Sequence, residues 1–518
     1  MNLKWIVPLS IALFFQTTSW AQQSSYSAYL AVVQELNLSD IRTTILNSGT
    51  HGLNPKIYWT DGMEKLFRAG GAAHTELRPE ADRAYLLLLQ HASIGIVDPE
   101  SMGVDVKIKR KSFISSQSLQ TLRLINANRA MPLLGSVAPQ NAQYNSLREA
   151  LRRFTIYCQS PWEKIPSISK PLKAGDSHVA IPAIKKRLKQ FGYRISTIDS
   201  NFDTETESAV NDIQWTLAMK PDGMISPGGK TLRYLEKGCE SRIQQIRLDM
   251  EKIRWFPQNF ENRHIFVNLA SAHFTLTDKT GNNTSYMTFK TIVGRDARKT
   301  PTMSDRITYI VFNPFWVVPP TIFREDKMEE IRSLDPSQVN AYFESRNYEV
   351  WNRAFTKRID PATIDWWKEN PNLDAEIYIR QKPSTMNALG VMKFMMTNAY
   401  AIYLHDTNQP ELFASARRQI SSGCVRLERP FDLAEYLLRG TKWTRAEIEN
   451  HVAKPGEVLS KDTRVNLAQS MPVYMAALTS QLSSDGVTRF TEDIYKQNAR
   501  LVEKGALMSE LANELGDE

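Results

Sequence analysis

The spacing of hydrophobic residues along this chain changes near residue 263. Before that point apolar residues recur at helical intervals, as in RAYLLLLQHA (83–92) and YNSLREALRRFTIY (144–157). Beyond it, the segments HIFVNLA (264–270), YMTFKTIVG (286–294) and ITYIVF (307–312) are rich in β-branched and aromatic residues and are bounded by turn formers. The pattern predicts a helical first half and a β-sheet in the second half.

The helical half is interrupted by a polar, proline-bearing stretch at residues 159–171, which predicts a linker. After it, residues 183–193 and 201–225 predict two amphipathic helices with loops, and the Asp222–Gly223 pair is a turn signal. A single helix from about 229 to 253 is expected to return the chain to the first helical region.

The strand half is expected to contain an insertion and a terminal hairpin. Helical patterns return between residues 323 and 378, where Trp366 and Trp367 are adjacent. Near the end, residues 471–478 and 483–495 predict two short strands, joined at the turn Asp485–Gly486 into a hairpin that adds to the sheet. The fold class is therefore multidomain α+β.

The length of the chain indicates how many domains it has, and its charge and motifs limit the kinds of molecule that it could bind. A chain of 518 residues exceeds what one hydrophobic core usually serves. Its net charge of +8 is spread along the sequence, which suits either an ordinary solvated surface or association with an anionic wall or membrane. No nucleotide-binding loop, zinc-ligand spacing or aromatic and basic stripe is present, so nucleotide, zinc and nucleic-acid functions are poorly supported.

The first residues have the anatomy of a cleaved secretory signal. Lys4 precedes an apolar stretch, residues 5–15, and a small-residue site ends at Ala21. The stretch is shorter than the roughly 20 residues that span a bilayer, which makes a retained anchor the weaker alternative. No cysteine follows the site, which argues against a lipoprotein. We expect a periplasmic protein.

The candidate chemistry lies in YLHDT (403–407) and SSGCVR (421–426). His405 and Cys424 are too far apart for one helix face, so neighbouring segments of a fold must bring them together. A free thiol is mostly protonated at neutral pH, and an enzyme that uses one places a base beside it. The pair therefore predicts a nucleophile and a general base, although an isolated cysteine is more often a small buried apolar residue.

Residues around Cys424 could complete such a site. Gly423 allows a tight turn and close approach of a substrate carbonyl to main-chain N–H groups, as an oxyanion hole requires. Arg426, two residues on, would point the same way as Cys424 in an extended segment and offer a positive charge. Tyr403 could assist at the oxyanion, and Ser421 and Arg426 could orient the loop or a substrate carboxylate.

The number of cysteines indicates whether Cys424 can be a free thiol. The chain has three cysteines, so in an oxidising compartment at least one of them has no partner for a disulfide within the chain. Cys158 and Cys239 flank a compact region, so we hypothesise that they form a disulfide and leave Cys424 free. Three reduced, partly buried cysteines are the alternative.

These motifs resemble the L,D-transpeptidases, cysteine enzymes that remodel bacterial peptidoglycan. The resemblance rests on HDT (405–407) with S-x-G-C-x-R (421–426), and extends to TIVGRDARKTP (291–301), RQKPSTMNALGVMKF (380–394) and NPFWVVPPTI (313–322). Together these are similar to the large Gram-negative members of the family, in which a lid divides the catalytic domain.

The chain departs from the family pattern at two positions. Ser422 stands where many members have histidine, so any role of that imidazole is absent, and Ser384 follows Pro383 where glycine is expected. Neither change removes a proposed catalytic group. Residues 171–238 also resemble the small three-helix peptidoglycan-binding domain, although Ile213, Trp215 and Leu217 would serve as core residues as readily as ligand contacts.

The resemblance implies a division of the chain with a mainly β catalytic domain. The expected segments are a signal peptide (1–21), a helical scaffold domain (22–170), a peptidoglycan-binding-like domain (171–238), a connecting helix (239–262), the catalytic domain (263–445) with its lid (323–378), and a C-terminal hairpin and tail (446–518).

The resemblance also implies a reaction. Cys424 would attack the third residue of a donor tetrapeptide stem, with His405 taking the thiol proton, and an acceptor stem amine would resolve the thioester. A carbapenem would acylate the same thiol. Peptidoglycan stems, and other cell-wall synthases, are the expected partners, and no cofactor is needed. An L,D-carboxypeptidase, an enzyme attaching a lipoprotein to the wall, and a catalytically silent wall-binding scaffold remain alternatives.

Overall fold

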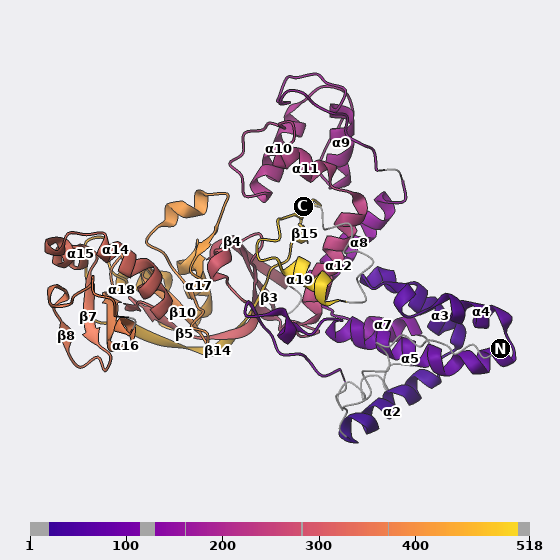
Figure 1. Ribbon diagram of the computed structural model, residues 1–518, viewed down its shortest axis with the longest axis horizontal. Helices are drawn as coiled ribbons and strands as arrows, with labels where there is room; N and C mark the ends of the chain where they lie inside the picture. The colour runs from indigo at the N-terminus through magenta and orange to yellow at the C-terminus, as the bar shows by residue number, and fades with distance from the viewer. Residues whose placement is uncertain (1–19, 114–129, 161, 281–282, 371, 506–518) are drawn as a thin grey trace.

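A computed structural model describes residues 20–113, 130–160, 162–280, 283–370 and 372–505 (Figure 1). The predicted signal sequence, apart from its last two residues, lies outside these ranges. Within them, no helix combines the length and the apolar character needed to cross a membrane. The expected multidomain α+β class is confirmed: helices occupy one end of the molecule and the sheet and lid the other (Figure 1).

The first helices form a bundle with its own core. Its longest helix contains the predicted apolar stretch 83–92, whose Tyr85, Leu88 and Leu89 are fully buried. Thr60 caps the start of another helix by accepting a hydrogen bond from the Met63 N–H. The helices of the bundle are α2 (Trp20–Gln34), α3 (Leu38–Leu46), α4 (Asp61–Ala69), α5 (Ala72–Ile94) and α7 (Ala130–Val137).

Two further helices, α8 (Ala142–Tyr157) and α12 (Cys239–Arg254), pack against each other beside the bundle (Figure 1). Between them in sequence lie three short helices that form the top of the molecule in Figure 1. These are α9 (Ile181–Gln190), α10 (Thr204–Thr216) and α11 (Lys230–Glu236). The two predicted amphipathic segments correspond to α9 and α10.

The prediction of one helix from 229 to 253 is wrong. The helix ends at Glu236, and a new one, α12, begins at Cys239. Lys237 and Gly238 between them are extended, with ψ of 127° and 151°, which breaks the helical hydrogen-bond ladder. The break frees α12 from the three-helix unit and lets it run along α8.

The second half of the chain forms a closed sheet. Strand β14 pairs in parallel with β2 and antiparallel with β5, so the path β5-β10-β11-β13-β4-β3-β2-β14 returns to its start. The predicted strands lie in β2, β4 and β5. The bounds are β2 (Arg263–Asn268), β3 (His273–Thr280), β4 (Asn283–Gly294), β5 (Thr302–Phe312), β10 (Met392–Met396), β11 (Leu404–His405), β13 (Val425–Leu427) and β14 (Thr463–Ala476).

Two short strands extend the sheet beyond this ring, and two helices cover it. Strand β1 (Val106–Lys107) pairs with β5, and β12 (Gln419–Ser421) pairs with β4. Leu433 from α17 (Pro430–Leu437) and Ile448 from α18 (Arg445–His451) are buried in the core that fills the sheet.

The segment expected to form a lid, called the lid below, contains a sheet as well as helices, so the helical expectation for residues 323–378 is only partly right. Four strands pair in the order β6-β9-β7-β8, because alternating apolar residues such as Val350 and Ile379 face a common core. Trp366 is fully buried there, whereas Trp367 is 38% exposed. The lid elements are β6 (Trp316–Val317), α13 (Pro320–Ile322), a π-helix (Phe323–Lys327), α14 (Met328–Arg332), α15 (Val339–Ser345), β7 (Tyr348–Asn352), β8 (Arg358–Ile359), α16 (Leu373–Glu376) and β9 (Ile377–Gln381).

The terminal hairpin differs from its prediction. A turn does lie at Asp485–Gly486, but it joins β15 (Ser480–Leu482) to β16 (Thr488–Phe490) in a separate two-stranded sheet. Residues 471–476 instead belong to β14. The chain leaves the large sheet after Ala476 because α12 binds the next residues, with Lys252 donating to the Ala477 carbonyl oxygen at 2.6 Å. The last described helix is α19 (Gln497–Lys504).

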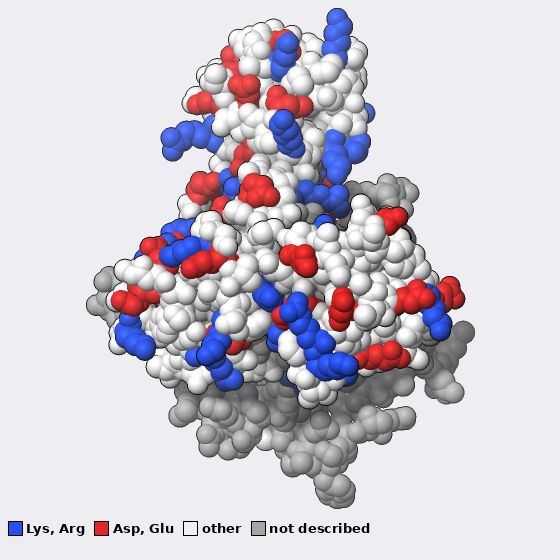
Figure 2. Space-filling model, turned by 90° about the vertical axis from the view of Figure 1, so that its left-hand side faces the viewer, with Lys and Arg blue, Asp and Glu red and all other residues white. Residues whose placement is uncertain are grey.

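The face of the molecule that carries the lid has no charge of one sign concentrated on it. Lys and Arg side chains are interspersed there with Asp and Glu side chains (Figure 2). This distribution agrees with the even spread of charge along the sequence.

Candidate active site

The strand register gathers the candidate residues on one face of the sheet. In the parallel pair β11–β13, His405 lies opposite Arg426, and in the antiparallel pair β10–β11, Lys393 lies opposite His405. Paired residues point to the same face, as do residues two apart in one extended segment. Tyr403 and Cys424 each precede one of these residues by two, so all five side chains share the face. The intervening residues point into the core.

Cys424 is the free cysteine of the described chain and is partly buried against the lid core. Its Sγ donates to the carbonyl oxygen of Ala401 at 3.5 Å. Burial raises the pKa of the thiol, and hydrogen bonding to Tyr403 and the positive charge of Lys393 oppose that rise. The resting form at neutral pH is therefore the thiol, and a base is needed to activate it.

Burial keeps His405 in the neutral form from which a general base acts. Its side chain is only 4% exposed, and burial, followed by the charge of Arg426, lowers its pKa to about 3. The imidazole is neutral at physiological pH and can accept a proton. Its Nδ1 has no hydrogen-bond partner among the described residues. No hydrogen bond joins it to Cys424 within that same part of the chain, so the two residues share a face without being bonded.

The loop before the thiol is held by Ser421. Gly423 adopts φ +118°, a backbone conformation that side-chain-bearing residues rarely take. Its N–H donates to Ser421 Oγ at 3.1 Å, and Ser421 Oγ donates to the Cys424 carbonyl oxygen at 2.7 Å. Ser421 thus orients the loop. The Gly423 N–H expected at the oxyanion is already bonded in this structure.

Arg298 connects this loop to the lid, a link that the sequence motifs did not reveal. Its guanidinium donates to Ser422 Oγ at 3.0 Å and forms a two-pronged ion pair with Asp326 at 2.6 and 2.7 Å. It also binds Glu325. Both acids lie in the π-helix of the lid, and π-helical turns often occur at functional sites. Ser422, which replaces the family histidine, is therefore a point of contact with the lid.

Lys393 was also missed by the sequence analysis. Its Nζ lies 3.9 Å from the centroid of the Tyr403 ring, and burial lowers its pKa. Burial and the neighbouring Cys424 raise the pKa of Tyr403, which keeps its hydroxyl protonated. The only available signal was one lysine in the apolar strand MKFMM (392–396).

Arg426 and the segment before Lys393 complete the surroundings. The Arg426 guanidinium donates to Gln409 Oε1 at 3.3 Å. Gly390 has φ +59°, and a Cβ there would lie 2.3 Å from Asp406 Oδ2, so glycine is required where the loop meets Asp406. Ser384, the other departure from the family pattern, is buried and forms a β-bridge with Val458.

The remaining two cysteines are joined. Cys158 and Cys239 form a disulfide with a Cα–Cα distance of 5.8 Å, at the end of α8 and the start of α12. The bond lies at the base of the three-helix unit and leaves Cys424 as the free thiol of the described chain.

Comparison with protein families identifies the class to which this site belongs. Residues 262–448 match the L,D-transpeptidase catalytic domain, named YkuD, residues 34–151 match the Scaffold domain, and residues 177–233 match the "Putative peptidoglycan binding domain". The chain therefore contains one region similar to the L,D-transpeptidase catalytic domain and another similar to a peptidoglycan-binding domain, in agreement with the resemblance seen in the motifs. These matches support a function of the peptidoglycan cross-linking type.

A curated relative points the same way. The "Putative L,D-transpeptidase" of Haemophilus influenzae is 31% identical over 263 residues, which cover 51% of this chain. This chain spans about half of that relative, 50% of its length.

Solved structures show only distant likeness. L,D-transpeptidase 3 from Mycobacterium tuberculosis is 11% identical, with a TM-score of 0.18, over 42% of this chain and 62% of that one. The L,D-transpeptidase from Stackebrandtia nassauensis is 11% identical, with a TM-score of 0.19, over 51% and 88%. At such TM-scores these likenesses carry no weight for fold or function.

Proposed function

We propose that this chain is a periplasmic L,D-transpeptidase that cross-links the third residues of peptidoglycan stem peptides through a cysteine thioester. The observation that carries the proposal is the placement of a free thiol, Cys424, on one sheet face with a neutral buried imidazole, His405, beneath a lid. The peptidoglycan-binding domain would hold the wall nearby. The predicted secretory signal supports the periplasmic location.

In the first half-reaction, Cys424 Sγ attacks the carbonyl carbon of the third residue of a donor tetrapeptide. His405 takes the thiol proton as the C–S bond forms, and then gives it to the amine nitrogen as the C–N bond breaks. D-Alanine leaves and a thioester remains on Cys424. A shift of the imidazole toward Sγ is needed for this transfer, since apo sites often tighten only when substrate binds.

In the second half-reaction, the side-chain amine of the third residue of another stem attacks the thioester carbonyl. His405 accepts a proton from that amine and returns one to the departing Sγ, so the cross-link forms and the thiol is regenerated. Other cell-wall synthases would work beside this enzyme on the same strands.

Charge that develops on the substrate oxygen needs stabilising groups in the site. The main-chain N–H of Cys424 and the Tyr403 hydroxyl are the nearest donors, and the Gly423 N–H becomes available if Ser421 Oγ releases it. Arg426 and Lys393 add two positive charges on the same sheet face, where they would attract a substrate carboxylate.

Intact-protein mass spectrometry of the full chain with a purified disaccharide tetrapeptide tests the proposal. We expect a transient adduct on Cys424, release of D-alanine and formation of a dimer. Cys424→Ser should abolish the adduct and keep the fold, and His405→Ala should slow adduct formation by about 10²–10⁴. Tripeptide as the only product would indicate a carboxypeptidase, and transfer to a lipoprotein amine would indicate an attachment enzyme. No adduct with stem or carbapenem would indicate a silent wall-binding scaffold.

A further inference from the structure

A cavity of about 480 Å³ lies where three parts of the chain meet. Its walls come from the end of α10 in the peptidoglycan-binding domain, from β2, β3 and the segment before β12 in the catalytic domain, and from the C-terminal hairpin. Its volume is in the range of small-molecule sites. None of its lining residues belongs to the candidate active site.

Trp215 of α10 forms one wall. It is half-buried, whereas its neighbours Ile213 and Leu217 are buried in the helical core. Its indole ring is therefore not needed to fill that core. A flat, partly exposed indole in a cavity with both polar and apolar walls offers a surface against which the apolar face of a sugar ring can pack.

Positive charge surrounds that ring. Lys290 Nζ lies 5.0 Å and Arg418 Cζ lies 5.5 Å from the centroid of the indole. Arg418, only 2% exposed, donates to the carbonyl oxygens of Ser271 and Ser415, and its Nε has no hydrogen-bond partner in the described chain. Neither cation forms a direct ion pair with a described carboxylate, but the charge of Glu428 acts against the lowering of the Arg418 pKa, and Glu428 accepts a hydrogen bond from the Lys290 main-chain N–H at 2.9 Å. By contrast, the acids of the cavity wall are already paired, Asp212 with Arg489 and Glu492 with Lys230.

A buried cation without a carboxylate partner is costly to keep. Burial lowers the pKa of Arg418 to about 10, which still leaves it charged at neutral pH. The cavity therefore brings together a partly exposed indole, over which Lys290 and Arg418 lie, and two cations that no described carboxylate pairs with directly. This combination suits a sugar linked to a peptide that carries carboxylates.

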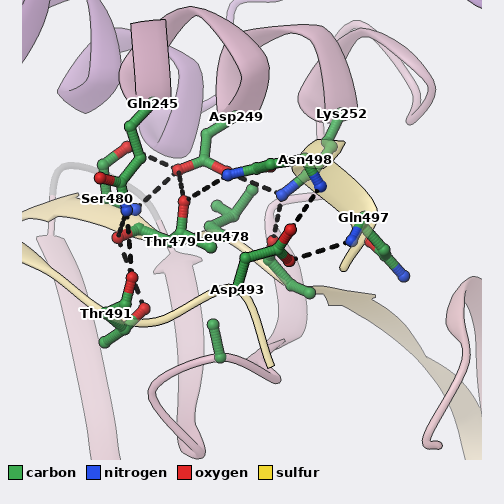
Figure 3. Close-up of polar contacts among 12 residues, drawn as sticks. Gln245, Asp249, Lys252, Leu478, Thr479, Ser480, Thr491, Asp493, Gln497 and Asn498 are labelled. Carbon is green, nitrogen blue, oxygen red and sulfur yellow. Dashed lines mark hydrogen bonds and ion pairs between the residues drawn. The ribbon is translucent and has the colours of Figure 1, made fainter. Parts of the chain in front are cut away.

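The hairpin wall is fixed to the central helix α12 by a buried polar network (Figure 3). Asp249 accepts hydrogen bonds from Ser480 N–H at 2.6 Å and from Thr479 Oγ1 at 3.1 Å, and Lys252 pairs with it at 2.9 Å. Gln245 donates to the carbonyl oxygens of Thr479 and Thr491. Because both threonines line the cavity, its shape is set before any ligand binds.

We propose that this cavity binds a muropeptide unit, with a sugar ring packed on Trp215 and a carboxylate near Lys290 and Arg418. The proposal rests on the proposed function for the identity of the polymer. Gln419, next to Arg418, pairs with Val293 in β12–β4, and that strand leads directly to the loop of Cys424. A bound sugar chain would thus be anchored to the segment that presents the nucleophile.

Calorimetric titration of the full chain carrying Cys424→Ser, which prevents turnover, tests the site. The probes are a disaccharide tetrapeptide and the same tetrapeptide without sugar. Trp215→Ala should weaken binding of the disaccharide tetrapeptide by roughly fivefold or more and leave the sugar-free peptide unchanged. Trp215→Phe should restore part of the affinity because it keeps an aromatic ring.

Substitutions that remove a positive charge test the carboxylate part of the proposal separately, and one of them is a matched control. Lys290 lies beside the Trp215 ring without lining the cavity, and Lys290→Gln should weaken binding of the disaccharide tetrapeptide. Arg417→Gln, at an exposed neighbour of Arg418 that makes no ring contact with Trp215 in the described chain, should not. Unchanged affinity in both Trp215→Ala and Lys290→Gln, with the folds intact by circular dichroism, would overturn the proposal. Equal losses in Lys290→Gln and Arg417→Gln would also overturn it, because they would indicate general electrostatic attraction.

The test of the cavity can be separated from the test of the proposed transpeptidase reaction. Acylation of wild-type Cys424 by the sugar-free tetrapeptide reports on the reaction alone. If acylation occurs and the cavity variants bind normally, the cavity proposal fails and the reaction stands. If acylation fails while Trp215→Ala still loses affinity for the sugar-bearing probe, the cavity is supported and the reaction is not.

Discussion

At the scale of single residues, the reactivity of the site depends on how burial sets the protonation of Cys424 and His405. Burial raises the pKa of the thiol and lowers that of the imidazole, so both groups are neutral at pH 7. The sequence revealed this pair through its motifs. It could not reveal Lys393, because one lysine within an apolar strand carries no sign of a function. Only the strand register shows that Lys393 lies opposite His405.

The lowered pKa of His405 predicts that the acylation rate does not fall in mildly acidic buffer. A histidine with its ordinary value of 6.5 would lose its basic form as the pH falls through that value. With a pKa near 3, His405 stays neutral, and the initial rate of carbapenem acylation should be nearly level from about pH 7 to about pH 5. A half-maximal rate near pH 6.5 in rapid-mixing assays would contradict this.

At the scale of elements, the Arg298 side chain links the lid directly to the loop that precedes Cys424. Arg298 reaches Asp326 on the lid and Ser422 on the loop, and its side chain is only 9% exposed. The lowered pKa of Asp326, caused first by Arg298, keeps that acid ionised at neutral pH. The position of the lid is therefore coupled to that of the loop.

Arg298→Gln should loosen both contacts at once. Charge-assisted hydrogen bonds contribute about 1.5–3 kcal/mol each, so the loss of part of this set should lower the acylation rate by about tenfold and increase proteolysis of the lid. Arg324→Gln, which removes an exposed lid ion pair with Asp374, is the matched control and should change neither. Equal effects of the two variants would disprove the coupling.

Elements differ in how far the sequence predicts them. Strands β2, β4 and β5 were predicted because their segments are rich in β-branched and aromatic residues and are bounded by turn formers. The helix break at Gly238 was missed because the apolar spacing continues across it, and only packing of α12 against α8 shows the change of direction. The turn at Asp485–Gly486 was found, but its flanking strands were misassigned because tertiary contacts from Lys252 and Asp249 decide where β14 ends.

At the scale of the whole molecule, the disulfide fixes the junction of α8 and α12 beneath the three-helix unit. It closes a loop over a sequence separation of 81 residues, which in the chain-entropy model stabilises the fold by about 4 kcal/mol. Changing both Cys158 and Cys239 to serine should lower the thermal unfolding temperature by several degrees, as reductant should for the wild type. Carbapenem acylation of Cys424 should persist. Identical unfolding curves with and without the disulfide would contradict this.

The core shared by α8, α12 and the end of the chain has a consequence for biosynthesis. Tyr474, Phe490 and Leu501 pack into the core formed largely by the helices, and the buried Asp249 is bonded by Thr479 and Ser480 as well as by Lys252. A ribosome delivers these residues after the helices. Until they emerge, the buried Asp249 has only its contact with Lys252, so the central helices of the nascent chain should remain loosely folded.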